Sequence, residues 1–271
     1  MFLNSVILIL QEILEAALLV SVLLVLSKHH GIKPIWLLPA IIIGITGALI
    51  FAINMAQISE WFDYVGQEVM NALMQLAILF FLSFLTALHP KNRWVSIFML
   101  ITVSLALTRE GSEIFIYIGG VIGQAPYIQS TQIQPTLTGA GIGAGIGVSA
   151  GVLIYYGLLG LPSRYIVASS VLLLALVGGN MASQATLLLT QADWLSYSQI
   201  LWNSSALLPE NSIFGHLLYA LVGYEATPSL FQVISYVCGM LFVYLCSLFR
   251  TPKIAPPTEN KATASRVNIN S

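Results

Sequence analysis

Residues 4–27, NSVILILQEILEAALLVSVLLVLS, form an apolar run in which the only charged side chains are Glu12 and Glu15. A helix needs about 20 predominantly apolar residues to cross the hydrocarbon core of a bilayer, so this run predicts a transmembrane helix. No basic residue precedes it, and no small-residue cleavage site follows at the distance typical of a signal peptide. We therefore expect this first helix to be retained in the membrane.

Six more runs of this kind follow, and turn-forming Gly, Pro and Asn residues separate several of them. They lie at residues 35–56, 69–88, 95–119, 139–160, 165–190 and 230–249. Hydrophobic residues make up 57% of the 271 positions and charged residues only 8%, whereas a soluble domain carries charge at about a quarter of its positions. The sequence predicts an all-α integral membrane protein, with a seven-helix permease domain at residues 1–249.

Loop charges give the expected orientation. Nine of the ten Lys and Arg residues follow spans one, three, five and seven, while the opposite loops contain six acidic residues and no basic one. Cytoplasmic loops retain Lys and Arg. We therefore expect a multi-pass protein of the inner or plasma membrane, with its N-terminus outside and its C-terminus in the cytoplasm. Residues 250–271 are rich in Pro, Thr, Asn and Lys and predict a disordered cytoplasmic tail.

Composition also excludes several classes of function. The net charge is −1, which gives no electrostatic reason to expect nucleic acid as a partner. Cys238 and Cys246 have no metal-ligand spacing. No nucleotide-binding or catalytic motif is present, so we expect neither an enzyme nor a single-chain ATP-driven pump. We also expect no permanently bound cofactor.

Two clusters of charged residues remain inside the predicted spans. The first is Gln11-Glu-Ile-Leu-Glu15 and the second is Arg109-Glu-Gly-Ser-Glu113. A charge at the bilayer centre costs about 2.5 kcal/mol or more, so four carboxylates cost on the order of 10 kcal/mol. A cost of this size indicates a function for the carboxylates rather than helix packing alone.

The spacing within each cluster indicates which function. Residues three apart lie on one face of a helix, with about 5–6 Å between their Cβ atoms. Glu12 and Glu15 therefore point to one place, as do Glu110 and Glu113. Arg109 lies one turn before Glu113 and can pair with it. Hard oxygen ligands favour hard cations such as ferric iron, manganese, magnesium or calcium.

The two clusters are 98 residues and three helices apart. Because span one and span four cross the membrane in opposite directions, a three-helix repeat has to be inverted, an arrangement that places a site at the interface between the repeats. The sequence therefore predicts two inverted three-helix repeats plus a seventh helix. In this arrangement both clusters lie slightly on the outer side of the midplane and meet there.

The clusters resemble the paired Arg-Glu-x-x-Glu motifs of the high-affinity, oxidase-dependent iron permeases of fungi and bacteria. The stretch at residues 212–233 is also similar to the final loop and last span of that family. The resemblance covers nearly the whole chain apart from the tail. It implies seven spans, with the motifs in spans one and four.

The resemblance also implies a substrate and a partner. Ferric iron, produced by a separate extracytoplasmic ferroxidase or iron-delivery protein, would be imported, and Glu12, Glu15, Glu110 and Glu113 would bind it. Arg109 corresponds to the motif arginine. Gln11 stands where the family usually has arginine, which leaves this half-site more negative than the family pattern.

Other polar residues support two interpretations. Glu68, Asn71 and Gln75 form a stripe along the outer half of span three, which is either an access path for the cation or a helix-packing stripe. Asn180, Ser183 and Gln184 occupy the corresponding part of span six. Side chains in the outer loops either concentrate cations at the mouth of such a path or are ordinary surface groups. These include Asp193, Glu210, His216 and Glu225.

Three functions fit these observations. The first is a permease that imports iron. The second is a transporter of another hard cation, manganese, or of protons. The third is a membrane subunit that anchors an oxidase and transports nothing.

Overall fold

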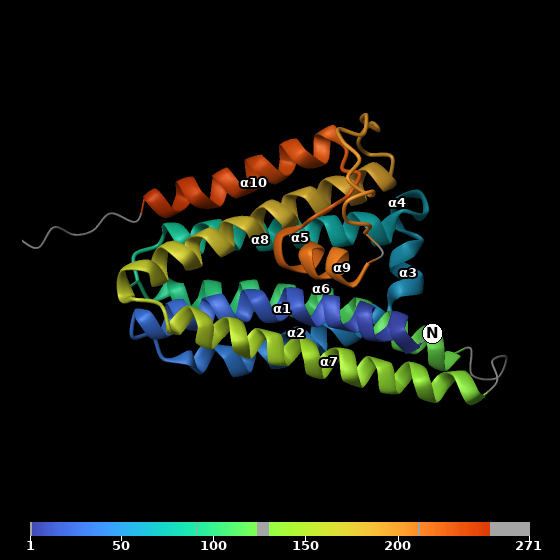
Figure 1. Ribbon diagram of the computed structural model, residues 1–271, viewed down its shortest axis with the longest axis horizontal. Helices are drawn as coiled ribbons and strands as arrows, with labels where there is room; N and C mark the ends of the chain where they lie inside the picture. Colours follow the sequence, from blue (N-terminus) through green and yellow to red (C-terminus); the bar gives the residue numbers. More distant parts are fainter. Residues whose placement is uncertain (1, 91, 124–129, 211, 250–271) are drawn as a thin grey trace, which may run out of the picture.

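The computed structural model describes residues 2–90, 92–123, 130–210 and 212–249, and these residues form a bundle of helices (Figure 1). The predicted tail at residues 250–271 lies outside the described residues. Seven of the described helices are long and apolar enough to cross a membrane, which confirms the all-α membrane fold. They are α1 (Phe2–His29), α2 (Leu37–Ile53, together with the preceding turn from Pro34), α5 (Gly66–Ala87), α6 (Trp94–Gly123), α7 (Ser130–Leu159), α8 (Ser163–Gln191) and α10 (Leu230–Leu248).

Four short helices lie in the connections. They are η1 (Pro34–Trp36), α3 (Met55–Ser59), α4 (Trp61–Tyr64) and α9 (Ile213–Val222). The Ser212 side chain caps the start of α9 by accepting a hydrogen bond from the Gly215 backbone N–H, and Gly223 ends the helix with φ of 70°. Ten apolar residues are too few to span a bilayer, and α9 instead packs against α1 and α8.

The long helices form two layers (Figure 1). One layer contains α1, α2, α6 and α7, and the other contains α5, α8 and α10. Within the first layer α1 packs mainly on α7 and α6 mainly on α2. If the repeat matches α1, α2 and α5 with α6, α7 and α8, then the α1–α7 pair of one arrangement corresponds to the α6–α2 pair of the other. This is the packing that an inverted repeat predicts, although the repeat itself stays a prediction.

Small residues allow α7 to approach α1 closely. Gly139, Gly143, Gly147 and Gly151 recur every four residues, and a Cβ atom built on any of them would lie less than 3.0 Å from an atom of α1. At Gly143 that atom is the backbone carbonyl oxygen of Val6. Such four-residue spacing is typical of close helix pairs in membranes. These four glycines therefore fix the position of α1, the helix that carries Glu12 and Glu15, against α7.

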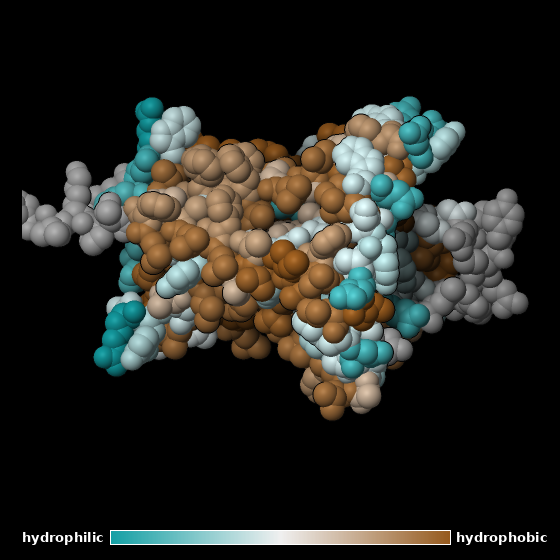
Figure 2. All heavy atoms as spheres, turned by 90° about the horizontal axis from the view of Figure 1, so that it is seen from above, coloured by the Kyte–Doolittle hydropathy of each residue, from teal (hydrophilic) through white to brown (hydrophobic). Residues whose placement is uncertain are grey.

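The surface matches a membrane environment. Figure 2 shows a broad hydrophobic band between hydrophilic groups at the two ends of the bundle. Large apolar side chains on α2 and α7, such as Ile42, Ile50 and Leu153, are exposed as well. Each long helix crosses the bundle once, so Lys28 and Arg164 fall at one end and Glu60 and Asp193 at the other.

Candidate functional site: a carboxylate cluster around Arg109

The site begins on α6, where Arg109 bonds two glutamates of its own helix. Its Nη1 atom lies 2.6 Å from Oε2 of Glu110 and 2.7 Å from Oε1. Its Nη2 atom lies 3.1 Å from Oε1 of Glu113, one helical turn further on. The hydroxyl of Ser112 donates to the Arg109 carbonyl oxygen at 2.7 Å. The predicted pairing of Arg109 with Glu113 is therefore present.

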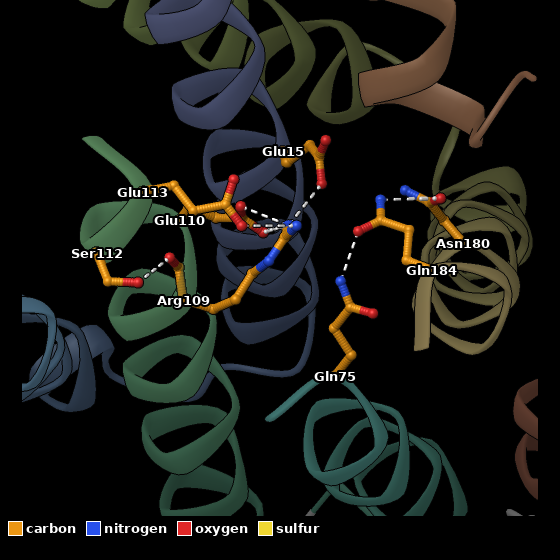
Figure 3. Close-up of polar contacts among 8 residues, drawn as sticks. All are labelled: Glu15, Gln75, Arg109, Glu110, Ser112, Glu113, Asn180 and Gln184. Atoms are coloured by element: carbon orange, nitrogen blue, oxygen red, sulfur yellow. Dashed lines mark hydrogen bonds and ion pairs between the residues drawn. The ribbon is translucent and has the colours of Figure 1, made fainter. Parts of the chain in front are cut away.

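The first cluster meets the second at the same guanidinium. Nη1 of Arg109 lies 3.3 Å from Oε2 of Glu15 on α1. Glu12, one turn earlier on α1, lies beside Glu113 and within electrostatic range of Arg109. Figure 3 shows the heads of Glu15, Glu110 and Glu113 turned toward Arg109. The structure thus brings the two predicted pairs together, as the inverted arrangement requires.

The cluster is enclosed by protein. Glu12, Glu15, Glu110 and Arg109 are all buried, and only the Glu113 side chain, with 32% of its surface exposed, has substantial access. Four carboxylates and one guanidinium sum to −3 if every acid is ionised. The guanidinium takes the central position. Among the described residues, no group of three or more His, Cys, Asp or Glu side chains is arranged to hold a metal ion.

A set of amide side chains borders the carboxylates. Gln75 of α5 donates through Nε2 to Oε1 of Gln184 on α8 at 2.5 Å. Gln184 donates in turn to Oδ1 of Asn180 at 3.2 Å and lies beside Glu15. Asn71 is also buried, one turn before Gln75. Two members of the predicted span-three stripe, Asn71 and Gln75, therefore lie inside the bundle.

A cavity of about 470 Å³ opens next to the first motif. Its lining includes Gln11, Glu210, His216 and Glu225, so four of the residues predicted to support or lead to the site share one space. Glu68 and Asp193 are not among its lining residues.

The acids of this cavity are held in place. Oε1 of Glu210 accepts hydrogen bonds from the backbone N–H groups of Ala226 and Thr227, at 2.7 and 3.2 Å. Oε2 of Glu225 accepts one from Nε2 of Gln232 at 2.6 Å. Glu210 therefore has a structural role in the loop as well as a place on the cavity wall.

Tyr219 was not predicted from the sequence. It lies on α9, lines the same cavity and is within electrostatic range of both Glu15 and Glu225. It is therefore a wall residue of the cavity that lies near the carboxylate cluster. The available signal was the apolar run at residues 213–222, which is too short to span and is typical of a re-entrant or interfacial segment.

The seven apolar helices define a multi-pass membrane protein, and the described residues enclose a cluster of carboxylates in its interior. Residues 91–251 match the iron permease FTR1 family. The chain belongs to this family, which confirms the predicted class: a membrane transporter of the iron permease type and not an enzyme.

Two curated relatives illustrate the similarity. The ferrous iron permease EfeU of Shigella flexneri is 29% identical over 184 residues, which cover 67% of this chain and 72% of that protein. The ferrous iron permease EfeU of Escherichia coli O157:H7 is also 29% identical over 184 residues, and this match covers 61% of its length. No solved structure is significantly similar to the chain.

Proposed function

We propose that this chain imports iron across a membrane and that Glu12, Glu15, Glu110 and Glu113 bind the ion on its way. The observation that carries the proposal is the convergence of Glu15, Glu110 and Glu113 on one buried guanidinium, with Glu12 beside them. Buried acids of this density are costly in a membrane and mark ion pathways. Their oxygen atoms are hard ligands that suit iron.

Arg109 acts as the resident cation of the unloaded site. It neutralises part of the charge of Glu110, Glu113 and Glu15, which otherwise repel one another. An arriving iron ion brings a higher charge into the same group of oxygens and takes over part of this neutralisation. The guanidinium then turns aside, and the glutamates exchange one positive partner for another.

The cavity lined by Gln11, Glu225 and Tyr219 is the proposed access path. Negative side chains in a concave, partly apolar space raise the local concentration of cations. Gln11 lies both on the cavity wall and next to Glu12 in the chain, so an ion in the cavity is close to the first motif.

The oxidation state of the imported iron has two candidates. Ferric iron reaches the outer side of the membrane from a partner ferroxidase or iron-delivery protein, as the family resemblance implies. A second candidate is direct import of ferrous iron, which is favoured by the name of the relatives, ferrous iron permease. Uptake of ferrous iron under anoxic conditions would support direct ferrous import, whereas uptake that requires both oxygen and an added ferroxidase would support ferric import.

Vesicles containing the purified full-length protein test the proposal. We expect them to accumulate radioactive iron, with manganous ions competing weakly, and we expect Glu12→Gln to abolish accumulation. Glu60→Gln is the matched control because Glu60 is exposed and lies outside the cluster. Wild-type vesicles without iron uptake would contradict the proposal and favour a subunit that anchors an oxidase. Stronger transport of manganese than of iron would favour the other cation transporter.

The proposed orientation places the N-terminus outside the cell membrane and the C-terminus in the cytoplasm, in line with the distribution of Lys and Arg. A membrane-impermeant thiol reagent applied to intact cells should label Glu60→Cys and not Lys33→Cys. Both native cysteines lie within α10. The reverse labelling pattern would show that the protein has the opposite orientation in the membrane.

A further inference from the structure

A second polar cluster lies between the two layers of the bundle. Asn71 and Gln75 come from α5, and Asn180 and Gln184 come from α8, in each case as an Asn followed four residues later by a Gln. All four side chains are buried, and Gln75 has no exposed surface. We call these four residues the amide cluster. Such a concentration of buried polar groups in apolar helices requires partners for its donors and acceptors.

The amide cluster adjoins the carboxylates through Gln184. This side chain accepts from Gln75, donates to Asn180 and lies beside Glu15 (Figure 3). The carboxylates project from the layer of α1 and α6, whereas the amides project from the layer of α5 and α8. The two polar groups therefore face each other across the interface between the layers.

Several oxygen atoms at this interface have no partner. Oδ1 of Asn71 and Oε1 of Gln75 are fully buried and accept no hydrogen bond from any described residue. On the opposite side, Oε2 of Glu12 and Oε1 of Glu15 are also buried and have no hydrogen-bond partner among the described residues. Leaving a buried acceptor unpaired costs about 1–3 kcal/mol. Unpaired oxygens on both sides of one interface are the arrangement expected where a cation is to be bound.

The carboxylates need additional ligands. Among the described residues, no group of three or more His, Cys, Asp or Glu side chains is arranged to hold a metal ion, and the Arg109 guanidinium lies among the glutamates. Amide oxygens are hard ligands like carboxylate oxygens but carry no charge. They can complete the coordination shell of a cation without adding negative charge to the site. This matters because transport requires the ion to be bound weakly enough for release.

We propose that the amide cluster supplies the neutral half of the ion's coordination shell, with Asn71 and Gln75 binding the cation opposite Glu12 and Glu15. This inference rests on the proposed function, because it assigns the remaining ligands of the same ion. Gln184 accepts a hydrogen bond from Gln75 and lies beside Glu15, so it is a positioning residue. The ion is bound between the two layers, and any movement of one layer relative to the other separates its charged ligands from its neutral ones.

Asn71→Leu gives the sharpest test. The substitution removes an unpaired buried oxygen and replaces it with apolar surface, so a purely structural role for Asn71 predicts unchanged or increased thermal stability and unchanged ion binding. A ligand role predicts the same stability effect together with weaker binding of ferrous iron, by about tenfold, in anoxic titrations of the purified full-length protein. Gln75→Leu should weaken binding similarly.

Ser170→Ala is the matched control. Ser170 lies on α8, the helix that carries Gln184, is fully buried and has an unpaired hydroxyl oxygen. It lies about 20 Å along the helix axis from Gln184 at 1.5 Å per residue. The Ser170→Ala variant should bind ferrous iron with the same affinity as the wild type. Wild-type affinity in both Asn71→Leu and Gln75→Leu would overturn the inference.

The two proposals fail in different ways. If wild-type protein binds neither ferrous nor ferric iron, or if Glu12→Gln binds iron normally, the proposed function fails and the amide cluster has no ion to bind. If wild-type binding depends on Glu12 but neither amide substitution weakens it, only the inference about the amide cluster fails.

Discussion

Nη1 of Arg109 on α6 lies 3.3 Å from Oε2 of Glu15 on α1, although the two residues are 94 positions apart in the chain. This contact joins the two Glu-x-x-Glu clusters into one group. It also places the positive charge where three carboxylates from two helices can reach it. The contact therefore links α1 to α6 and also keeps the Arg109 guanidinium among the glutamates of the proposed ion site.

Replacing Arg109 with Gln should destabilise the protein strongly. Removing one partner of a buried ion pair leaves uncompensated charge and costs about 3–5 kcal/mol. Thermal unfolding in detergent measures this loss. Added iron should raise the unfolding temperature of Arg109→Gln more than that of the wild type, because the ion supplies the missing positive charge.

Arg164→Gln is the control for this prediction. Arg164 is exposed at the end of the bundle opposite Glu60 and Asp193 and makes a cation–π contact with Tyr165, so its loss should change stability little. Equal stabilisation of Arg109→Gln and wild-type protein by iron would show that the guanidinium and the ion do not share ligands.

Gly143→Ala tests the close approach of α7 to α1. A Cβ atom at this position would clash with the Val6 carbonyl oxygen, so the helices must move apart, at a cost of about 1–3 kcal/mol. Gly145→Ala meets nothing within 4 Å and should be neutral or slightly stabilising. We expect only Gly143→Ala to lower both the unfolding temperature and iron uptake. Similar behaviour of the two variants would contradict this account of the interface.

Glu225 should make stability depend on pH. Burial raises the pKa of its carboxyl above the ordinary value of 4.5, the hydrogen bond from Gln232 opposes this shift, and the charge of Glu210 adds to it. The folded protein therefore holds this proton more tightly than the unfolded chain does. Stability from the group is fully present below the unfolded pKa and is lost as pH rises through the folded pKa.

Glu225→Gln removes this titration and can still accept the hydrogen bond from Gln232. The variant should match the wild type in unfolding temperature below pH 4.5 and exceed it at neutral pH. It should also lose apparent affinity for iron, because the cavity becomes less negative. Unfolding temperatures of the two proteins that differ by the same amount at every pH would exclude Glu225 as the cause.

The span pattern and the carboxylate spacing could be predicted because both depend on short-range sequence. Seven apolar runs define seven helices, and the i, i+3 spacing of Glu12 and Glu15 places them on one face. The meeting of the two motifs followed from counting helices between them. In these respects the structure agrees closely with the sequence.

Long-range packing accounts for what the sequence did not reveal. The backbone of Phe62, Asp63 and Tyr64 has positive φ values of 55–71°, which non-glycine residues adopt only when the surrounding structure imposes them. Tyr219 lies near Glu15 because α9 packs against α1. The link from Gln75 to Gln184 spans 109 residues. None of these positions has a local signal that identifies its partner.

The central claim is that glutamates from α1 and α6 bind the same ion, and a double-mutant cycle on Glu12 and Glu113 tests it most directly. The measurement is the free energy of iron binding to purified wild-type protein, Glu12→Gln, Glu113→Gln and the double variant. Shared coordination predicts that each single substitution weakens binding and that the two effects are coupled by about 0.5–3 kcal/mol. Effects that add within about 0.5 kcal/mol, or binding unaffected by either substitution, would contradict a common site.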